Sequence, residues 1–92
     1  MDAVTVRFVE DARTQEQMLR ELRTAADKMA AEQLITNVRI DPVYPGASDA
    51  RSRALFVMKF EGLTNRVVQL LSAVPGVLRA YSASERRAAV RY

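Results

Sequence analysis

Carboxylates are the side chains of this chain whose chemistry and spacing could hold a metal ion. Glu10 and Asp11 are adjacent and follow a stretch of alternating apolar residues that begins next to Asp2. Magnesium and calcium are bound in proteins mainly through oxygen ligands of this kind. We therefore name Asp2, Glu10 and Asp11 as candidate cation ligands. The alternative is that Glu10 and Asp11 are solvated loop charges near the positive end of a following helix, where carboxylates are favoured.

Histidine and cysteine do not occur in the sequence. A disulfide framework and a thiolate metal site are therefore excluded, and so are the usual zinc ligands and the usual general base. The sequence also lacks a Walker-type loop and a dinucleotide-binding loop. We accordingly predict a protein that is not an enzyme, with no cofactor and no transition-metal site.

Length and charge point to one small domain with a mixed surface. The chain has 92 residues, and its 14 basic and 11 acidic residues are interspersed, giving a net charge of +3. This pattern favours a solvated surface with at most a mild attraction to acidic partners. No run approaches the about 20 apolar residues of a membrane span, and no signal peptide is recognisable. We expect a cytoplasmic location.

The spacing of apolar residues predicts strand, helix, strand, strand, helix and strand in that order. Thr14 and Gln17 form a T-x-x-Q capping box at the start of the first helix, and Pro42 suits the end of a strand but not its centre. We expect residues 44–49 to form an exposed, mobile loop. Residues 1–84 should form the domain, with 85–92 a basic tail or a short extra strand. The expected bounds are 3–9, 15–33, 34–42, 53–61, 63–74 and 77–82.

This order predicts an α+β, ferredoxin-like β-α-β-β-α-β sandwich, in which both helices cover one face of a four-stranded antiparallel sheet. In the third strand, Ala54, Phe56, Met58 and Phe60 alternate with Arg53, Leu55, Val57 and Lys59. The first set is bulkier and should face the core. Leu55 and Val57 would then lie on the open face with Arg7 and Arg39. Exposed apolar groups there predict contact with a protein partner or self-association.

The segment from Leu63 to Tyr81, which contains LLSAVPGVLRAY, resembles the second helix and last strand of ACT domains. The chain is most similar to the ACT-like domains that follow the membrane segment of MgtC-type proteins, which are associated with magnesium limitation and virulence in bacteria. The resemblance implies a regulatory domain acting by protein–protein contact, including contact with its own membrane domain. It also implies the cytosolic part of an inner-membrane protein. It transfers no site residue.

Two other binding functions are considered for this element order. Amino-acid-binding ACT domains have a glycine-containing turn after the first strand, but residues 10–14 contain no glycine. An RNA-binding module resembling ribosomal protein S-six is the alternative function. It would require a contiguous basic patch, and RNA-recognition motifs also use exposed aromatic rings. Phe56 and Phe60 are assigned to the core, so nucleic acid is disfavoured. Arg86, Arg87 and Arg91 of the tail are expected to be solvated.

Overall fold

The computed structural model of this chain describes residues 2–82. The expected tail or extra strand at 85–92 lies outside the described residues. The elements are β1 (Asp2–Phe8), α1 (Gln15–Ala31), β2 (Ile35–Pro42), α2 (Ala50–Arg53), β3 (Leu55–Gly62), α3 (Thr64–Ser72) and β4 (Val77–Ser82).

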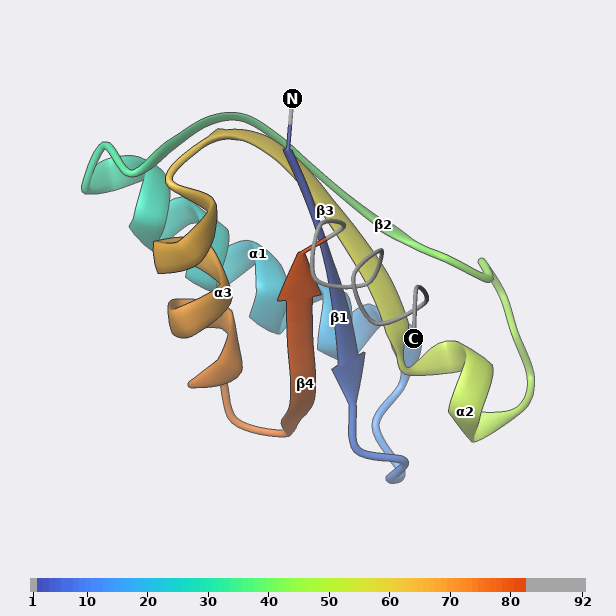
Figure 1. Cartoon of the computed structure of the whole chain (residues 1–92). Helices are drawn as coiled ribbons and strands as arrows, with labels where there is room; N and C mark the ends of the chain where they lie inside the picture. The colour runs from blue at the N-terminus through green and yellow to red at the C-terminus, as the bar shows by residue number, and fades with distance from the viewer. Residues whose placement is uncertain (1, 83–92) are drawn as a thin grey trace, which may run out of the picture.

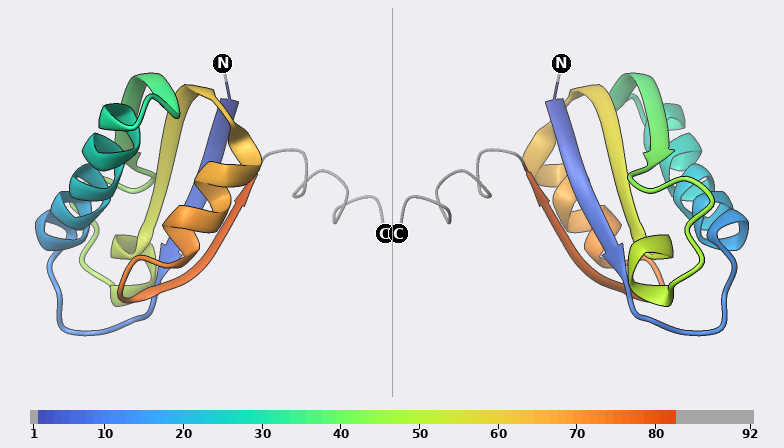
Figure 2. Two further views of the ribbon diagram at one scale, coloured as in Figure 1. Left: turned by 90° about the vertical axis from the view of Figure 1, so that its left-hand side faces the viewer. Right: turned by 90° about the vertical axis from the view of Figure 1, so that its right-hand side faces the viewer.

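The four strands form one antiparallel sheet in the order β2-β3-β1-β4. Both long helices lie on one face of the sheet, with α1 packed mainly over β2 and α3 mainly over β4. Figure 1 shows the sheet in front of α1, and the side views in Figure 2 show the helices on one side of the strands. The α+β sandwich expected from the sequence is therefore confirmed.

The core lies between the sheet and the two long helices. Phe8 and Phe56 come from neighbouring strands, and their rings meet edge to face with centroids 5.7 Å apart. Completely burying a side chain of this size contributes about 1.5–3 kcal/mol. The assignment of even-numbered residues of β3 to the core is confirmed: Ala54 at the strand's start and Phe56, Met58 and Phe60 within it are at most 1% exposed.

Helix α1 begins where the capping box predicts. The Thr14 side chain accepts a hydrogen bond from the Gln17 backbone N–H, and the Gln17 side chain accepts one from the Thr14 N–H. This exchange satisfies two donors that a helix start otherwise leaves unpaired. The helix then buries one stripe against the sheet, made of Met18, Leu22, Ala26 and Met29.

The segment before β3 differs from the prediction. Residues 50–53 form the short helix α2, and β3 begins at Leu55 rather than at Arg53. Asp49 caps α2 by accepting from the Ser52 N–H at 3.0 Å, which is the local reason for this turn. Arg53 therefore does not belong to the alternating pattern of the strand; its guanidinium donates to the Ser48 carbonyl at 2.8 Å.

The loop at 44–49 is largely exposed, as expected, but it is tied to the start of α1. The Gln15 side chain donates to the Tyr44 carbonyl and accepts from the Gly46 N–H, both at 3.1 Å. These two bonds fix the loop relative to the helix. None of the helices in residues 2–82 has the length and apolar character that crossing a membrane requires.

Candidate functional site

The three candidate cation ligands are not brought together. Asp2 begins β1, whereas Glu10 and Asp11 follow its other end. Seven strand residues span about 20 Å, which is far more than one cation can bridge. In the described part of the chain, no group of three acidic residues is placed to hold a metal ion.

Asp11 is instead held by Arg13. A guanidinium nitrogen of Arg13 lies 3.0 Å from the Asp11 carboxylate, which also accepts the Arg13 backbone N–H at 3.0 Å. The side-chain hydrogen bond from Arg13 is the main cause that lowers the pKa of the Asp11 carboxyl below 3.8. The same guanidinium pairs with Glu21 at 2.6 Å. The Asp11 carboxylate is therefore part of a structural ion-pair network with Arg13 and Glu21.

Arg13 was not singled out from the sequence, although it joins two distant loops. Its guanidinium lies 5.1 Å from the centroid of the Phe8 ring and donates to the Pro75 carbonyl at 3.3 Å. The next residue, Gly76, has a φ of +85°, and a Cβ added there would overlap this guanidinium. Glycine at position 76 therefore leaves the space that the Arg13 guanidinium occupies. The contact with Pro75 joins residues about sixty positions apart, so no local spacing pattern in the sequence could predict it.

The predicted interface residues do share one surface, the open face of the sheet. Leu55 and Val57 lie on β3, one of the two central strands, and both are partly exposed. Leu55 is opposite Arg7, Val57 is opposite Thr5 on β1 and Asp41 on β2, and Arg39 is opposite Lys59. Neither long helix covers this face, since α1 and α3 pack on the other one, whereas the short helix α2 meets it at Arg7, which donates to the Arg51 carbonyl.

Two pairs of basic residues face each other across neighbouring strands of the open face. Arg39 of β2 is opposite Lys59 of β3, and Arg7 of β1 is opposite Arg79 of β4. Like charges in directly opposite positions destabilise a sheet. The stability of each pair therefore depends on whether a carboxylate lies close enough to offset the repulsion.

The Arg39–Lys59 pair has carboxylates beside it. Arg39 binds Asp41 through an ion pair of 2.8 Å between its Nε and a carboxylate oxygen. Glu61 follows Lys59 on the same face of β3 and accepts a hydrogen bond from Asn37. Arg39 is therefore neutralised by a direct ion pair, and Glu61 adds a second negative charge to this corner.

The Arg7–Arg79 pair has no such partner. Within residues 2–82, no carboxylate lies within ion-pair distance of either guanidinium. Arg7 makes one long hydrogen bond, 3.4 Å, to the Arg51 carbonyl. Arg79 lies over the Tyr81 ring, 5.5 Å from its centroid. We call the surface formed by Arg7, Arg79 and Arg51 the basic corner.

A β-bulge places an apolar side chain beside the basic corner. Phe8 is opposite Val77 but Arg7 is opposite Arg79, so Leu78 is the extra residue of β4. Bulges of this kind redirect a side chain, and Leu78 is 64% exposed. It lines a hollow of about 300 Å³ whose other lining residues are Arg7, Phe8, Val9, Glu10 and Arg51. The sequence offered no sign of this bulge.

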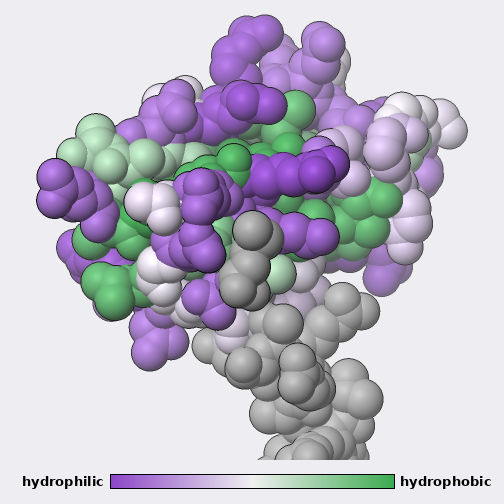
Figure 3. Space-filling model, turned by 90° about the horizontal axis from the view of Figure 1, so that it is seen from above, coloured by the Kyte–Doolittle hydropathy of each residue, from purple (hydrophilic) through white to green (hydrophobic). Residues whose placement is uncertain are grey.

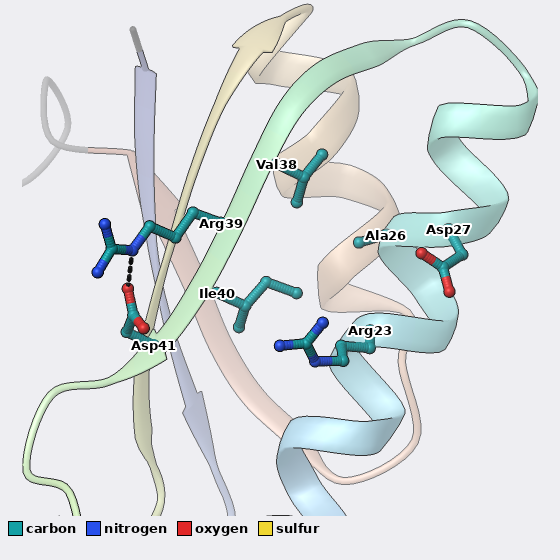
Figure 4. Close-up of a pocket in the computed structure, with 7 residues that line it drawn as sticks. All are labelled: Arg23, Ala26, Asp27, Val38, Arg39, Ile40 and Asp41. Carbon is teal, nitrogen blue, oxygen red and sulfur yellow. Dashed lines mark hydrogen bonds and ion pairs between the residues drawn. The ribbon is translucent and has the colours of Figure 1, made fainter.

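A second hollow, also about 300 Å³, lies between α1 and the edge strand β2. In Figure 4 the Arg23 side chain of α1 reaches toward Ile40, and Val38 also points to the helix side. The carboxylates of Asp27 and Asp41 lie on opposite sides of this region, and Asp41 points away with Arg39. Two carboxylates so placed cannot act on one bound group.

The described residues at the end of the molecule where β1 begins and β3 ends form a mixed surface. Figure 3 shows this end with hydrophilic and apolar residues interspersed. A large continuous apolar patch would have marked a contact surface there.

Comparison of the chain with protein-family models, with curated proteins and with solved structures gives no match in any of the three.

Proposed function

We propose that this chain is a non-catalytic interaction domain that binds a protein partner through the open face of its sheet. The observation that carries the proposal is the position of Leu55 and Val57. They are partly exposed on a central strand of a face that neither of the two long helices covers. Apolar side chains in such a place favour a contact that removes them from water.

The surroundings of these two residues suit a protein contact. Thr5 and Asp41 lie on either side of Val57, and Arg7 lies beside Leu55. An apolar centre with a polar margin is the usual composition of protein–protein interfaces. A domain that acts by binding a partner also requires no catalytic acid and base held close together.

A finer form of the proposal identifies the domain as the ACT-like regulatory domain of an MgtC-type membrane protein. Its supports are the resemblance of Leu63–Tyr81 to the ACT pattern and the order of the strands and helices. In this form the partner of the open face includes the protein's own membrane domain, and the function is linked to magnesium limitation and virulence. The domain would then be cytosolic.

The RNA-binding alternative has weaker support than protein contact. Base stacking needs aromatic rings on the exposed face of the central strands. Thr5 and Val57 occupy the middle of that face, while Phe56 and Phe60 are 0% exposed on the core side. Tyr81 lies on the edge strand β4.

Site-specific photocrosslinking in the native host tests the proposal. A photoreactive residue at Val57 should give discrete adducts with a partner protein, and an adduct of twice the chain mass would identify the partner as a second copy. The matched control carries the same group at Ala30, an exposed position of α1. Identical adducts from both positions, or none from Val57, would show that the open face is not the binding surface.

A further inference from the structure

We infer that the basic corner binds a carboxylate of the partner, so that the partner segment is acidic with an apolar side chain next to the acidic one. This inference rests on the proposed function, because it specifies the chemistry of what the open face binds. Its basis is the combination of unpaired cations, a redirected leucine and a shallow hollow in one place.

The first argument is the unused hydrogen-bonding capacity of the basic corner. A guanidinium has five N–H donors in a planar fork that matches a carboxylate. Among the described residues, Arg7 donates only to the Arg51 carbonyl, at 3.4 Å, and Arg79 has no hydrogen-bond acceptor. Both guanidiniums therefore keep donors free for a carboxylate, which would also relieve the repulsion of two opposite cations.

The second argument is the apolar surface beside these cations. Leu78 is 64% exposed and Val9 is 38% exposed, and both line the hollow that Arg7 and Arg51 border. An apolar side chain adjacent to the partner's carboxylate can occupy this hollow while the carboxylate reaches Arg7. The bulge at Leu78 is what brings the apolar and basic groups to one side.

The third argument favours a peptide carboxylate over a polyanion such as nucleic acid. Glu10 lines the same hollow, so a second negative charge of the ligand would be repelled there. At the start of the nearby helix α2, the Ser52 N–H is already bonded to the Asp49 carboxylate. In addition, no aromatic ring other than that of buried Phe8 lines the hollow.

The chain contains its own matched control. Arg39 and Lys59 occupy directly opposite positions on the same face, but Arg39 already forms an ion pair with Asp41. Replacing Arg79 or Arg39 by Gln removes one positive charge from the open face in either case. A ligand attracted by net charge alone would respond equally to both variants, whereas a ligand bound at the basic corner would respond only to Arg79→Gln.

The test uses the full-length chain, labelled with nitrogen-15, and the side-chain Nε–Hε signals of its arginines. The probe is an acetylated, amidated octapeptide of alternating Glu and Leu, and its counterpart has Gln in place of Glu. We expect saturable shifts of the Arg7 and Arg79 signals with the Glu peptide. Arg79→Gln should weaken this binding about tenfold, as expected for one charge-assisted hydrogen bond. Arg39→Gln should change it less than about twofold, as expected for a charge outside the site.

Three results would overturn the inference. Equal weakening by Arg79→Gln and Arg39→Gln would show attraction to net charge, and equal binding of the Gln peptide would show an apolar contact only. Tighter binding of octauridylate at the same arginines would identify a nucleic-acid surface. Unchanged backbone amide spectra of the free variants exclude a folding defect as the cause.

Failure of this inference can be told from failure of the proposed function. Partner adducts from Val57 together with no peptide binding at the basic corner would overturn the carboxylate site and leave the open face as an interface. Peptide binding at Arg7 and Arg79 without adducts from Val57 would overturn the proposed function, and with it the assignment of the ligand to a protein partner.

Discussion

The two faces of the sheet use the same strands and the same backbone pairing, yet they differ in what covers them. Phe56 and Val57 are neighbours on β3, and their side chains point to opposite faces. Phe56 is 0% exposed against Phe8 and the helices, whereas Val57 is partly exposed beside Thr5. Backbone pairing therefore cannot account for the difference. The core exists on one face because α1 and α3 pack there.

A second difference exists within the open face. At the Arg39 end, Asp41 forms an ion pair with Arg39, whereas at the Arg7 end no described carboxylate lies within ion-pair distance of a guanidinium. A balanced pair serves the stability of the free domain. An unbalanced pair lowers that stability slightly, and a bound anion would restore it.

The largest difference in the free energy of unfolding should be seen between substitutions of two neighbouring residues that point to opposite faces. Phe56→Ala should lower the free energy of unfolding by about 3–5 kcal/mol, because it removes a buried ring and leaves a cavity. Val57→Thr, on the open face, should change it by less than about 1 kcal/mol, because its side chain is only partly covered. Urea denaturation measures both.

A domain of this size has a modest total stability, so Phe56→Leu serves as the milder variant. It should cost about 1–1.5 kcal/mol. A larger loss for Val57→Thr than for Phe56→Leu would show that the open face belongs to a core that residues 2–82 do not reveal.

Removing the cap of α1 should have the next largest effect. Thr14→Ala should lower the free energy of unfolding by about 1 kcal/mol, because the Gln17 N–H loses its acceptor at the helix start. Thermal unfolding followed by circular dichroism measures it. Thr24→Ala, at an exposed position inside the same helix, is the control and should not lower stability, because alanine is the better helix former and only a hydrogen bond to the Arg20 carbonyl is lost.

The two basic pairs should respond with opposite signs. Arg39→Gln breaks the ion pair with Asp41 and should lower the free energy of unfolding by about 0.2–0.5 kcal/mol, the usual value of an exposed pair. Arg7→Gln removes the repulsion with Arg79 and should raise it by about 0.2–0.5 kcal/mol. Urea denaturation at low and high salt compares them, since salt should reduce both changes. The same sign for both would contradict the contrast between the corners.

The smallest effect concerns pH and Asp11. The bond from Arg13 lowers the pKa of the Asp11 carboxyl, so its stabilising contribution is complete above 3.8 and is lost as pH falls through the lower folded value. Carbon-13 NMR of the carboxyl group should show titration below pH 3.8. In Arg13→Gln the pKa should return toward its ordinary value, and an unchanged midpoint would separate Asp11 from Arg13.

Local patterns predicted much of the fold because they depend on residues close together in sequence. The alternation in 53–61 identified the buried and open faces of β3, and Thr14 with Gln17 located the start of α1. The short helix α2 was missed, because a four-residue turn has too little periodicity to stand out from a loop. Of the candidate site, the sequence brought Leu55, Val57, Arg7 and Arg39 to one face.

What only the tertiary structure decided is which of these residues stand opposite one another. The sequence by itself determined the order of the elements and the apolar face of each, since helix and strand periods are local properties. Strand register, the bulge at Leu78 and the contact of Arg13 with Pro75 join residues far apart in the chain. They are set when the sheet and helices pack. The meeting of Arg7 with Arg79 is therefore a property of the fold, which neither residue's neighbours in sequence reveal.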